Sequence, residues 1–328
     1  MNLFATVLTY PAPSANYRGE SELNRTVIQK VTDGRFDYPI ISPEAMRNAL
    51  REILRQYGLP SNRERLHPVS GKGKSEDGGE GDKQGLAVKF AKFPDPDQFA
   101  DDFFFGYLLA VKGKELDKVR KEKGDKYPMK RDSVLRMNLA KALEPYRHNA
   151  IFTQSPELKD SPWKPGGGDA KANSALLHRE TAVTPFQYPF ALNLNDCQAQ
   201  PDWSKKLLKA IGELNDVAGN HARSYFEMAP ASIVIRLTES LVAGYETYGF
   251  KKAAKGDGYI FPEVVDGILH EPQPDYPGSE FYIGGRIVKD MDEKSAARLT
   301  QLGVTLDRDP RRLLETVANK AFPAKGAK

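Results

Sequence analysis

Asp202–Thr238, DWSKKLLKAIGELNDVAGNHARSYFEMAPASIVIRLT, joins the clearest helix pattern of the chain to its clearest strand pattern. In its first half, apolar residues recur at helical spacing, lysines lie off that stripe, and Gly219 with Asn220 ends the pattern. In its last seven residues apolar and β-branched side chains alternate, which is typical of a half-buried strand. The segment therefore predicts a helix that leads into a strand of a sheet, with Asn220, His221 and Arg223 in the loop between them.

A similar strand and helix open the chain. LFATVLTYPA (3–12) predicts a strand, and ISPEAMRNALREILRQYGLP (41–60) predicts a helix with Ser42 as its N-cap and Pro43 at its first position. DDFFFGYLLAV (101–111) resembles a buried strand, FALNL (190–194) predicts another, and SVLRMNLAKAL (133–143) fits either strand or helix. The strongest elements give the order βαββαβ. This order predicts an α+β protein with a ferredoxin-like or RNA-recognition-motif (RRM) sheet and large insertions.

Composition and charge limit the class of protein. With 328 residues, 40% apolar side chains and a single cysteine, the chain can fold without a disulfide framework or a cysteine-rich metal site. No apolar run approaches the roughly 20 residues of a membrane helix, and no secretion signal opens the chain, so we expect a cytoplasmic protein with no membrane partner. The net charge is +4, but Lys112–Arg147 holds 12 basic and 6 acidic residues, so the rest totals −2. Basic charge concentrated in this way can attract a polyanion; the alternative is a run of charges that is simply solvated.

Signatures of metal or cofactor chemistry are missing from the sequence. The five histidines show no HxxxH or HExxH spacing, and KPGGGDAK (164–171) lacks the context and ending of a phosphate-binding loop. Asp101 and Asp102 could hold magnesium, but neighbours along a strand point to opposite faces. We therefore expect no metal, no cofactor and no enzyme activity.

Several segments, in order, resemble a known family. TYPAPSANYRGE, ISPEAMRNALREIL, DDFFFGYLLA, KRDSVLRMNLAKAL, HRETAVTPFQYPFALNL and GNHARSYFEMAPASIVIRL together are similar to the CRISPR-associated backbone subunit of Cascade surveillance complexes. That subunit belongs to the RAMP superfamily. More narrowly, the segments resemble its DevR-type autoregulator branch from type I-B systems. The resemblance runs from Met1 to about Thr238.

The resemblance implies a protein shaped like a right hand. It places an RRM-like palm at 1–57, 129–147 and 188–240, a finger insertion with a flexible loop (70–85) at 58–128, and a thumb hairpin at 148–187; a C-terminal extension (241–328) packs on the palm. It implies a non-catalytic subunit that polymerises in a helical filament along the spacer of CRISPR RNA and presents it to target DNA. Other Cascade subunits are implied partners. Whether a helicase-nuclease or, as in transposon-encoded variants, transposition adaptor proteins join the complex stays open.

A backbone subunit must hold RNA of any sequence, so it should contact phosphate and ribose through cationic and amide groups. Each candidate RNA contact has a purely structural alternative. These alternatives are an ordinary polar loop, a solvated helix face with Glu44 and Glu52 as intrahelical partners, and local salt bridges of a hairpin. Asn220 more simply caps the helix before it. The predicted RNA-binding residues are Asn16, Tyr17, Arg18, Asn24, Arg25, Ser42, Arg47, Arg51, Lys130, Arg131, Arg136, Arg147, His148, Arg179, His221 and Arg223.

A second function stays open on the same scaffold. A metal-independent endoribonuclease that processes CRISPR RNA would use two histidines, such as His148 and His221, as general acid and base. Cleavage of a labelled repeat-spacer RNA in EDTA separates this alternative from simple binding.

Overall fold

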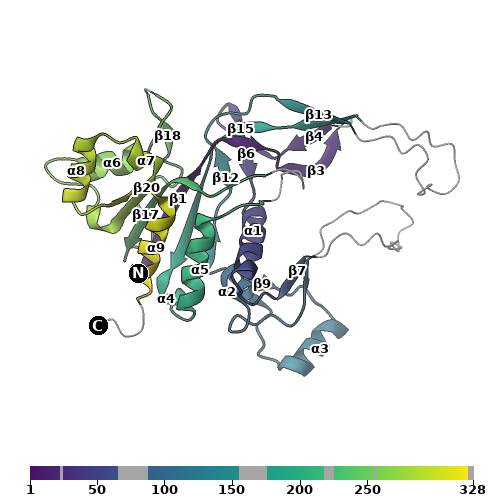
Figure 1. Cartoon of the computed structure of the whole chain (residues 1–328). Helices are drawn as coiled ribbons and strands as arrows, with labels where there is room; N and C mark the ends of the chain where they lie inside the picture. Colours follow the sequence, from purple (N-terminus) through teal and green to yellow (C-terminus); the bar gives the residue numbers. More distant parts are fainter. Residues whose placement is uncertain (23–24, 66–87, 155–175, 218–224, 255, 324–328) are drawn as a thin grey trace.

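A computed structural model gives the fold (Figure 1) and describes residues 1–22, 25–65, 88–154, 176–217, 225–254 and 256–323. The centre is an antiparallel sheet in which β1 lies between two long strands. β1 pairs with β16, from Asn2↔Asn193 to Leu8↔Gln187, and with β17, from Asn2↔Thr238 onward. These strands are β1 (Asn2–Thr9), β16 (Phe186–Asn193) and β17 (Pro230–Thr238).

The predicted ferredoxin-like order is confirmed. β16 also pairs with two short strands, β11 (Leu135–Met137) and β12 (Ala140–Ala142), so SVLRMNLAKAL is strand and not helix. The resulting spatial order, β17-β1-β16-β11/β12, is the order 4-1-3-2 of a βαββαβ unit. Its two helices are α1 (Pro43–Gln56) and α5 (Pro201–Gly212).

The central sheet is longer than the sequence pattern predicts. Beyond β17 it continues through β20 (Phe281–Gly285) and the parallel strand β21 (Thr305–Asp307). Beyond β12 it continues through β6 (Phe36–Ile41) and β5 (Lys30–Asp33). The C-terminal part of the chain is therefore joined to the central sheet by main-chain hydrogen bonds.

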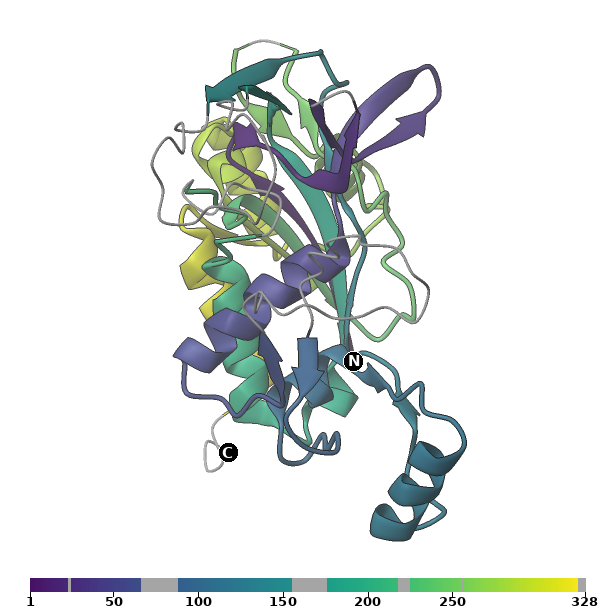
Figure 2. The same ribbon diagram turned by 90° about the vertical axis from the view of Figure 1, so that its right-hand side faces the viewer.

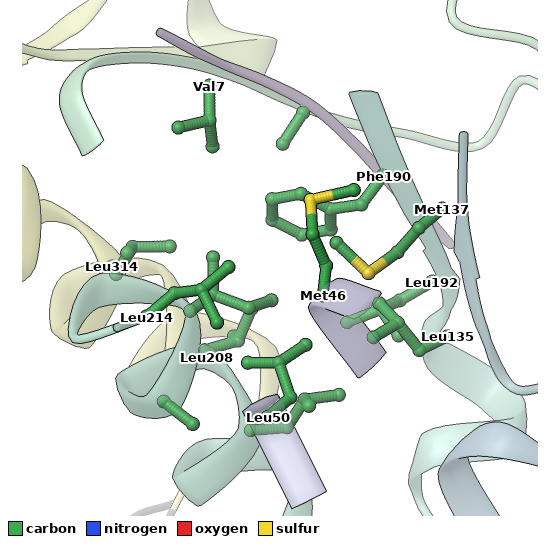
Figure 3. Close-up of a cluster of buried hydrophobic side chains, with 14 of the residues drawn as sticks. Val7, Met46, Leu50, Leu135, Met137, Phe190, Leu192, Leu208, Leu214 and Leu314 are labelled. Atoms are coloured by element: carbon green, nitrogen blue, oxygen red, sulfur yellow. The ribbon is translucent and has the colours of Figure 1, made fainter. Parts of the chain in front are cut away.

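Three helices cover one face of this sheet. α1, α5 and α9 (Pro310–Ala321) pack their apolar stripes on inward side chains of β1, β11 and β16. Figure 3 shows Met46 and Leu50 of α1, Leu208 of α5 and Leu314 of α9 converging on this core. The alternation of β1 follows: Leu3, Ala5 and Val7 face the helices, whereas Leu8 joins a second core.

The second core lies under the C-terminal part, on the other face of the sheet. Phe250, Phe261 and Phe281 are fully buried there with Leu8 and Val234. Its remaining elements are β18 (Lys251–Lys252), β19 (Tyr259–Ile260), α6 (Pro262–Leu269), a 3-10 turn (Gly278–Glu280), α7 (Arg286–Lys289) and α8 (Glu293–Gln301). A short helix, α4 (Leu194–Cys197), follows β16.

The polar connection after β1 and the segment around residue 150 form separate small sheets. One has the order β13-β14-β4-β3, and the other pairs β15 with β2. The strands are β2 (Ala12–Ser14), β3 (Tyr17–Glu22), β4 (Arg25–Ile28), β13 (Ala150–Gln154), β14 (Leu176–Glu180) and β15 (Ala182–Thr184). Segments about 150 residues apart in the chain therefore lie side by side (Figure 1).

Residues 58–131 fold outside the central sheet, beyond the end of α1. Their elements are β7 (Arg63–Arg65), β8 (Val88–Phe90), α2 (Ala100–Phe105), β9 (Tyr107–Leu108), α3 (Lys114–Lys123) and β10 (Lys130–Arg131). α3 projects away from the body of the molecule in both views (Figures 1 and 2). α2 lies against α1 in the same core, where Arg51 approaches Asp101.

Two predictions of secondary structure are wrong. DDFFFGYLLAV begins as helix α2, because the Asp101 carboxylate accepts hydrogen bonds from the backbone of residues 62 and 63, and Gly106, at φ 64°, ends the helix before β9. α5 ends at Gly212 and not near Gly219. Leu214 and Val217 continue the apolar spacing of α5 and are buried, but they lie in extended chain after the helix. Backbone hydrogen bonds with Phe226 and Met228 hold this segment in place.

Candidate nucleic-acid interface

The start of α1 has the geometry that the sequence predicts, but its polar groups bind the protein itself. The Ser42 hydroxyl accepts a hydrogen bond from the Ala45 amide at 3.2 Å and caps the helix. Asn16 is 8% exposed, and its side-chain amide donates to the Ile40 carbonyl at 2.9 Å. The Ser42 hydroxyl and the Asn16 side-chain amide therefore stabilise the start of α1, and both are bonded to the protein and not directed to a ligand.

Arg47 and Arg51 do not play equivalent roles. Arg51 is 8% exposed, donates to Asn48 at 3.0 Å, and lies 3.6 Å from the Asp101 carboxylate and 5.3 Å from the Phe105 ring centre. Burial, together with the nearby Arg63, lowers the pKa of Arg51 to about 10. Arg47 is half-buried and has no ion-pair partner within the described ranges. Arg47 can therefore meet an anion, whereas Arg51 is directed into the protein.

An arginine cluster, defined here as Arg51, Arg63 and Arg131, surrounds α2. Arg63 donates to the carbonyl of Gly106, and the guanidinium of Arg131 lies 5.5 Å from the Phe103 ring centre. No local signal in the sequence singles out Arg63, because only the fold brings β7 against the end of α2. Arg131 keeps a buried Nε without a hydrogen-bond partner in the described part of the chain.

Two buried carboxylates balance this cluster. Asp101 accepts from the backbone amides of Asn62 and Arg63 at 2.8 and 2.9 Å. Asp102 accepts from the Asn62 side chain at 2.8 Å, while its second oxygen is buried without a partner among the described residues. Burial raises the pKa of Asp102. Across the described ranges, no group of three or more His, Cys, Asp or Glu is arranged to hold a metal ion.

The remaining predicted cations are exposed but face different directions. Lys130 lies in β10 opposite Leu108, at the edge of residues 58–131. Arg136 is exposed between buried Leu135 and Met137, which face the helices, so it points to the opposite side of the central sheet. The structure therefore does not bring Lys130, Arg136 and Arg51 to one surface.

The small four-stranded sheet gathers a second group of predicted residues. Arg179 of β14 is opposite Ile151 of β13 on one side and Thr26 of β4 on the other. The His178 ring lies 4.2 Å from the ring of Phe152, which is 60% exposed. Pairing of β14 with β13 and β4 thus joins the polar connection to strands about 150 residues later in the chain, and Phe152, His178 and Arg179 lie on the two later strands.

Beside this sheet lies a cavity of about 330 Å³ whose lining includes Arg147, His148, Asn149 and Thr181. Arg147, His148 and Arg179 have no ion-pair partner within the described ranges. Lys30 of β5, which the sequence pattern did not single out, lies 3.3 Å from the buried carboxylate of Glu180 at the end of β14.

Some predicted residues lie outside the described part of the structure. Asn24, His221 and Arg223 fall in undescribed segments. Tyr17 and Arg18 lie in β3 and Arg25 lies in β4, and the side chains of all three fall outside the described part. No helix of the described ranges is long and apolar enough to cross a membrane.

The mixed α+β architecture with a mostly antiparallel central sheet has counterparts among solved structures. Two solved chains share it, one from a CRISPR RNA-guided surveillance complex described as pre-nicking (TM-score 0.58) and one from a CRISPR RNA-guided surveillance complex (TM-score 0.52). Each is 13% identical and is matched over 98% of this chain and 100% of its own length.

Sequence comparison points the same way. The chain is 27% identical over 292 residues to the CRISPR-associated protein Cas7/Cst2/DevR of Myxococcus xanthus (strain DK1622), which covers 89% of this chain and 88% of that protein. No protein-family model matches the chain. The chain is therefore similar to this relative along most of both sequences, and it shares the fold of the two solved chains.

Proposed function

We propose that the chain is a CRISPR RNA-binding backbone subunit that polymerises along the spacer of a guide RNA and presents it to target DNA. The observation that carries this proposal is the similarity to the Cas7/Cst2/DevR protein along 89% of the chain, combined with the shared fold. Within the proposal, the chain belongs to the DevR branch of type I-B-like systems and assembles with further Cascade subunits. The palm, finger, thumb and C-terminal ranges given above are part of the same proposal.

The phosphate contacts of this proposal lie mainly on the small sheet and its cavity. Arg147 and Arg179 are cations without a carboxylate partner in the described part of the chain, next to the aromatic pair Phe152 and His178. Arg47 at the start of α1 extends the surface. The proposal leaves out Arg51 and Asn16 as direct contacts, because both side chains are buried and donate hydrogen bonds within the protein.

The salt dependence of binding tests the RNA surface. For a single strand, log K falls with log salt by about 0.7 for each phosphate neutralised. Arg147→Ala with Arg179→Ala should reduce that slope by about 1.4 and weaken binding of unrelated RNA sequences equally. Lys205→Ala with Lys209→Ala is the matched control on α5, at a distance from the small sheet, and should leave the slope unchanged. An unchanged slope in the first variant removes the small sheet from the site.

The proposal includes no catalytic role. His148 is exposed, and the structure shows no general-acid partner for it among the described residues. A labelled repeat-spacer RNA incubated with the protein in EDTA should stay intact. Cleavage that is lost in His148→Ala and His221→Ala would establish the endoribonuclease instead.

A further inference from the structure

One cavity of the described residues lies in the C-terminal part, away from the candidate interface. It measures about 600 Å³, and β19, α6, α7 and the start of α8 line it. Ile260, Val265 and Met291 give it an apolar wall. We call it the acidic pocket, because four aspartates and one arginine form its charged rim, with a net charge of −3.

Two of these aspartates have no counter-charge. Asp290 lies 3.8 Å from Arg286, and Asp292 caps α8 by accepting from the Ser295 amide at 2.9 Å. Asp257 and Asp266 are exposed and have no ion-pair partner within the described ranges. An apolar wall with free carboxylates at its rim suits a lysine side chain, whose aliphatic stem packs on apolar surface while its ammonium stays at the rim.

The projecting helix α3 carries the complementary charge. Lys112–Lys126 holds seven basic and four acidic residues, a net charge of +3. Lys114, Lys118 and Lys121 follow the spacing i, i+4, i+7, so they form one exposed row about 10 Å long. None of the three has an ion-pair partner among the described residues, whereas Val119 is buried and holds the helix to its support.

The two features lie at opposite ends of the molecule. In Figures 1 and 2, α3 extends from one end and α6, α7 and α8 form the other. Complementary patches at opposite ends give a heterologous, head-to-tail contact, which repeats from copy to copy instead of closing a two-fold dimer.

We propose that α3 of one copy docks in the acidic pocket of the next copy, with lysines of the row at Asp257 and Asp266. This inference deepens the proposed polymerisation and rests on it. It also identifies which parts of the chain make the copy-to-copy contact, namely residues 112–126 of one copy and the C-terminal part of its neighbour.

A charge swap tests the contact on the full-length protein. The arm variant is Lys114→Glu/Lys118→Glu/Lys121→Glu, the pocket variant is Asp257→Lys/Asp266→Lys, and the swap variant carries both sets. Lys205→Glu/Lys206→Glu/Lys209→Glu on α5 matches the charge change of the arm variant. Mass photometry counts copies on a long RNA, titration on a short RNA that holds one copy measures binding without neighbours, and a thermal melt verifies folding.

The arm and pocket variants should each need at least tenfold more protein to fill the long RNA, and the swap variant should recover most of that loss. Binding to the short RNA should be equal in the arm variant and the α5 control. The pocket variant is decisive, because its added positive charge would strengthen assembly if net charge alone mattered.

Three results overturn the docking: an unimpaired pocket variant, a swap variant that recovers nothing, or short-RNA binding that falls further in the arm variant than in the α5 control. The last result would make α3 an RNA contact. If the wild type binds short RNA but occupies long RNA without cooperativity, the docking fails while RNA binding stands. If it binds neither RNA, the proposed function itself fails.

Discussion

Replacing Asp101 with asparagine should destabilise the protein strongly, whereas the same isosteric change at Asp102 should not. Both aspartates are buried at the start of α2, with exposed fractions of 2% and 0%. The two aspartates differ in how many of their carboxylate oxygens accept hydrogen bonds. Asp101 receives hydrogen bonds on both oxygens, whereas Asp102 receives them on one.

The magnitude follows from these contacts. At Asp101, Oδ1 accepts from the Asn62 amide at 2.8 Å, and Oδ2 accepts from the Arg63 amide at 2.9 Å and the Ser61 hydroxyl at 3.1 Å. In either orientation, an asparagine turns its NH₂ toward one of these amides and leaves it unsatisfied, at a cost of about 1–3 kcal/mol. Buried Arg51 also loses its counter-ion, so the total is about 3–5 kcal/mol.

At Asp102 the same change keeps the contacts that exist. An asparagine oxygen in the place of Oδ2 still accepts from Asn62 at 2.8 Å and from the Asp95 amide at 3.0 Å. Its NH₂ takes the place of an oxygen that has no partner in the described part of the chain. The lost hydrogen-bond strength is offset by the removal of a buried charge, so the expected change is within about 1 kcal/mol.

Trp203 reports on this region, since its ring packs edge-on against Phe103 of α2 at 6.2 Å. In a Trp163→Phe background it is the single tryptophan, and urea unfolding followed by its fluorescence compares both variants with exposed Asp117→Asn as control. The Asp101 variant should unfold at much lower urea, and the other two near the parent. Equal midpoints for the two neighbouring variants would refute the hydrogen-bond argument.

Two further predictions concern pH and the core. Burial raises the pKa of Asp102, so the stability tied to its protonated form is present below the ordinary aspartate pKa of about 4 and is lost as pH rises through the higher folded-state pKa. Relative to Asp102→Asn, the wild type should therefore weaken as pH rises above about 4, as urea midpoints at several pH values can show. Leu50→Ala removes a fully buried side chain between α1 and α5 (Figure 3) and should cost about 2–5 kcal/mol, whereas Leu241→Ala, at an 87% exposed position, should change the unfolding free energy by less than about 0.5 kcal/mol in the same assay.

The elements that local sequence signals define are the ones that the sequence predicts correctly. Ser42, Pro43 and the apolar stripe of α1 are all within one short segment, and so is the alternation of β17. Because helix and strand periodicities are properties of neighbouring residues, the βαββαβ order could be inferred without any knowledge of tertiary contacts. The family resemblance, and not periodicity, singled out Arg147 and Arg179 as candidate cations, and neither shows what surrounds them.

Tertiary structure decided what depends on residues far apart in the chain. α2 is a helix and not a strand because Asp101 binds the backbone of residues 62 and 63, which no local pattern shows. Arg51 looked like a phosphate ligand by its spacing from Arg47, yet α2 buries it beside a carboxylate. Strand pairing between β14 and β4 places Arg179 next to the polar connection after β1. The sequence by itself determined which groups can carry charge and which segments can become helix or strand; packing and long-range hydrogen bonds determined which charges are neutralised and which stay free for a ligand.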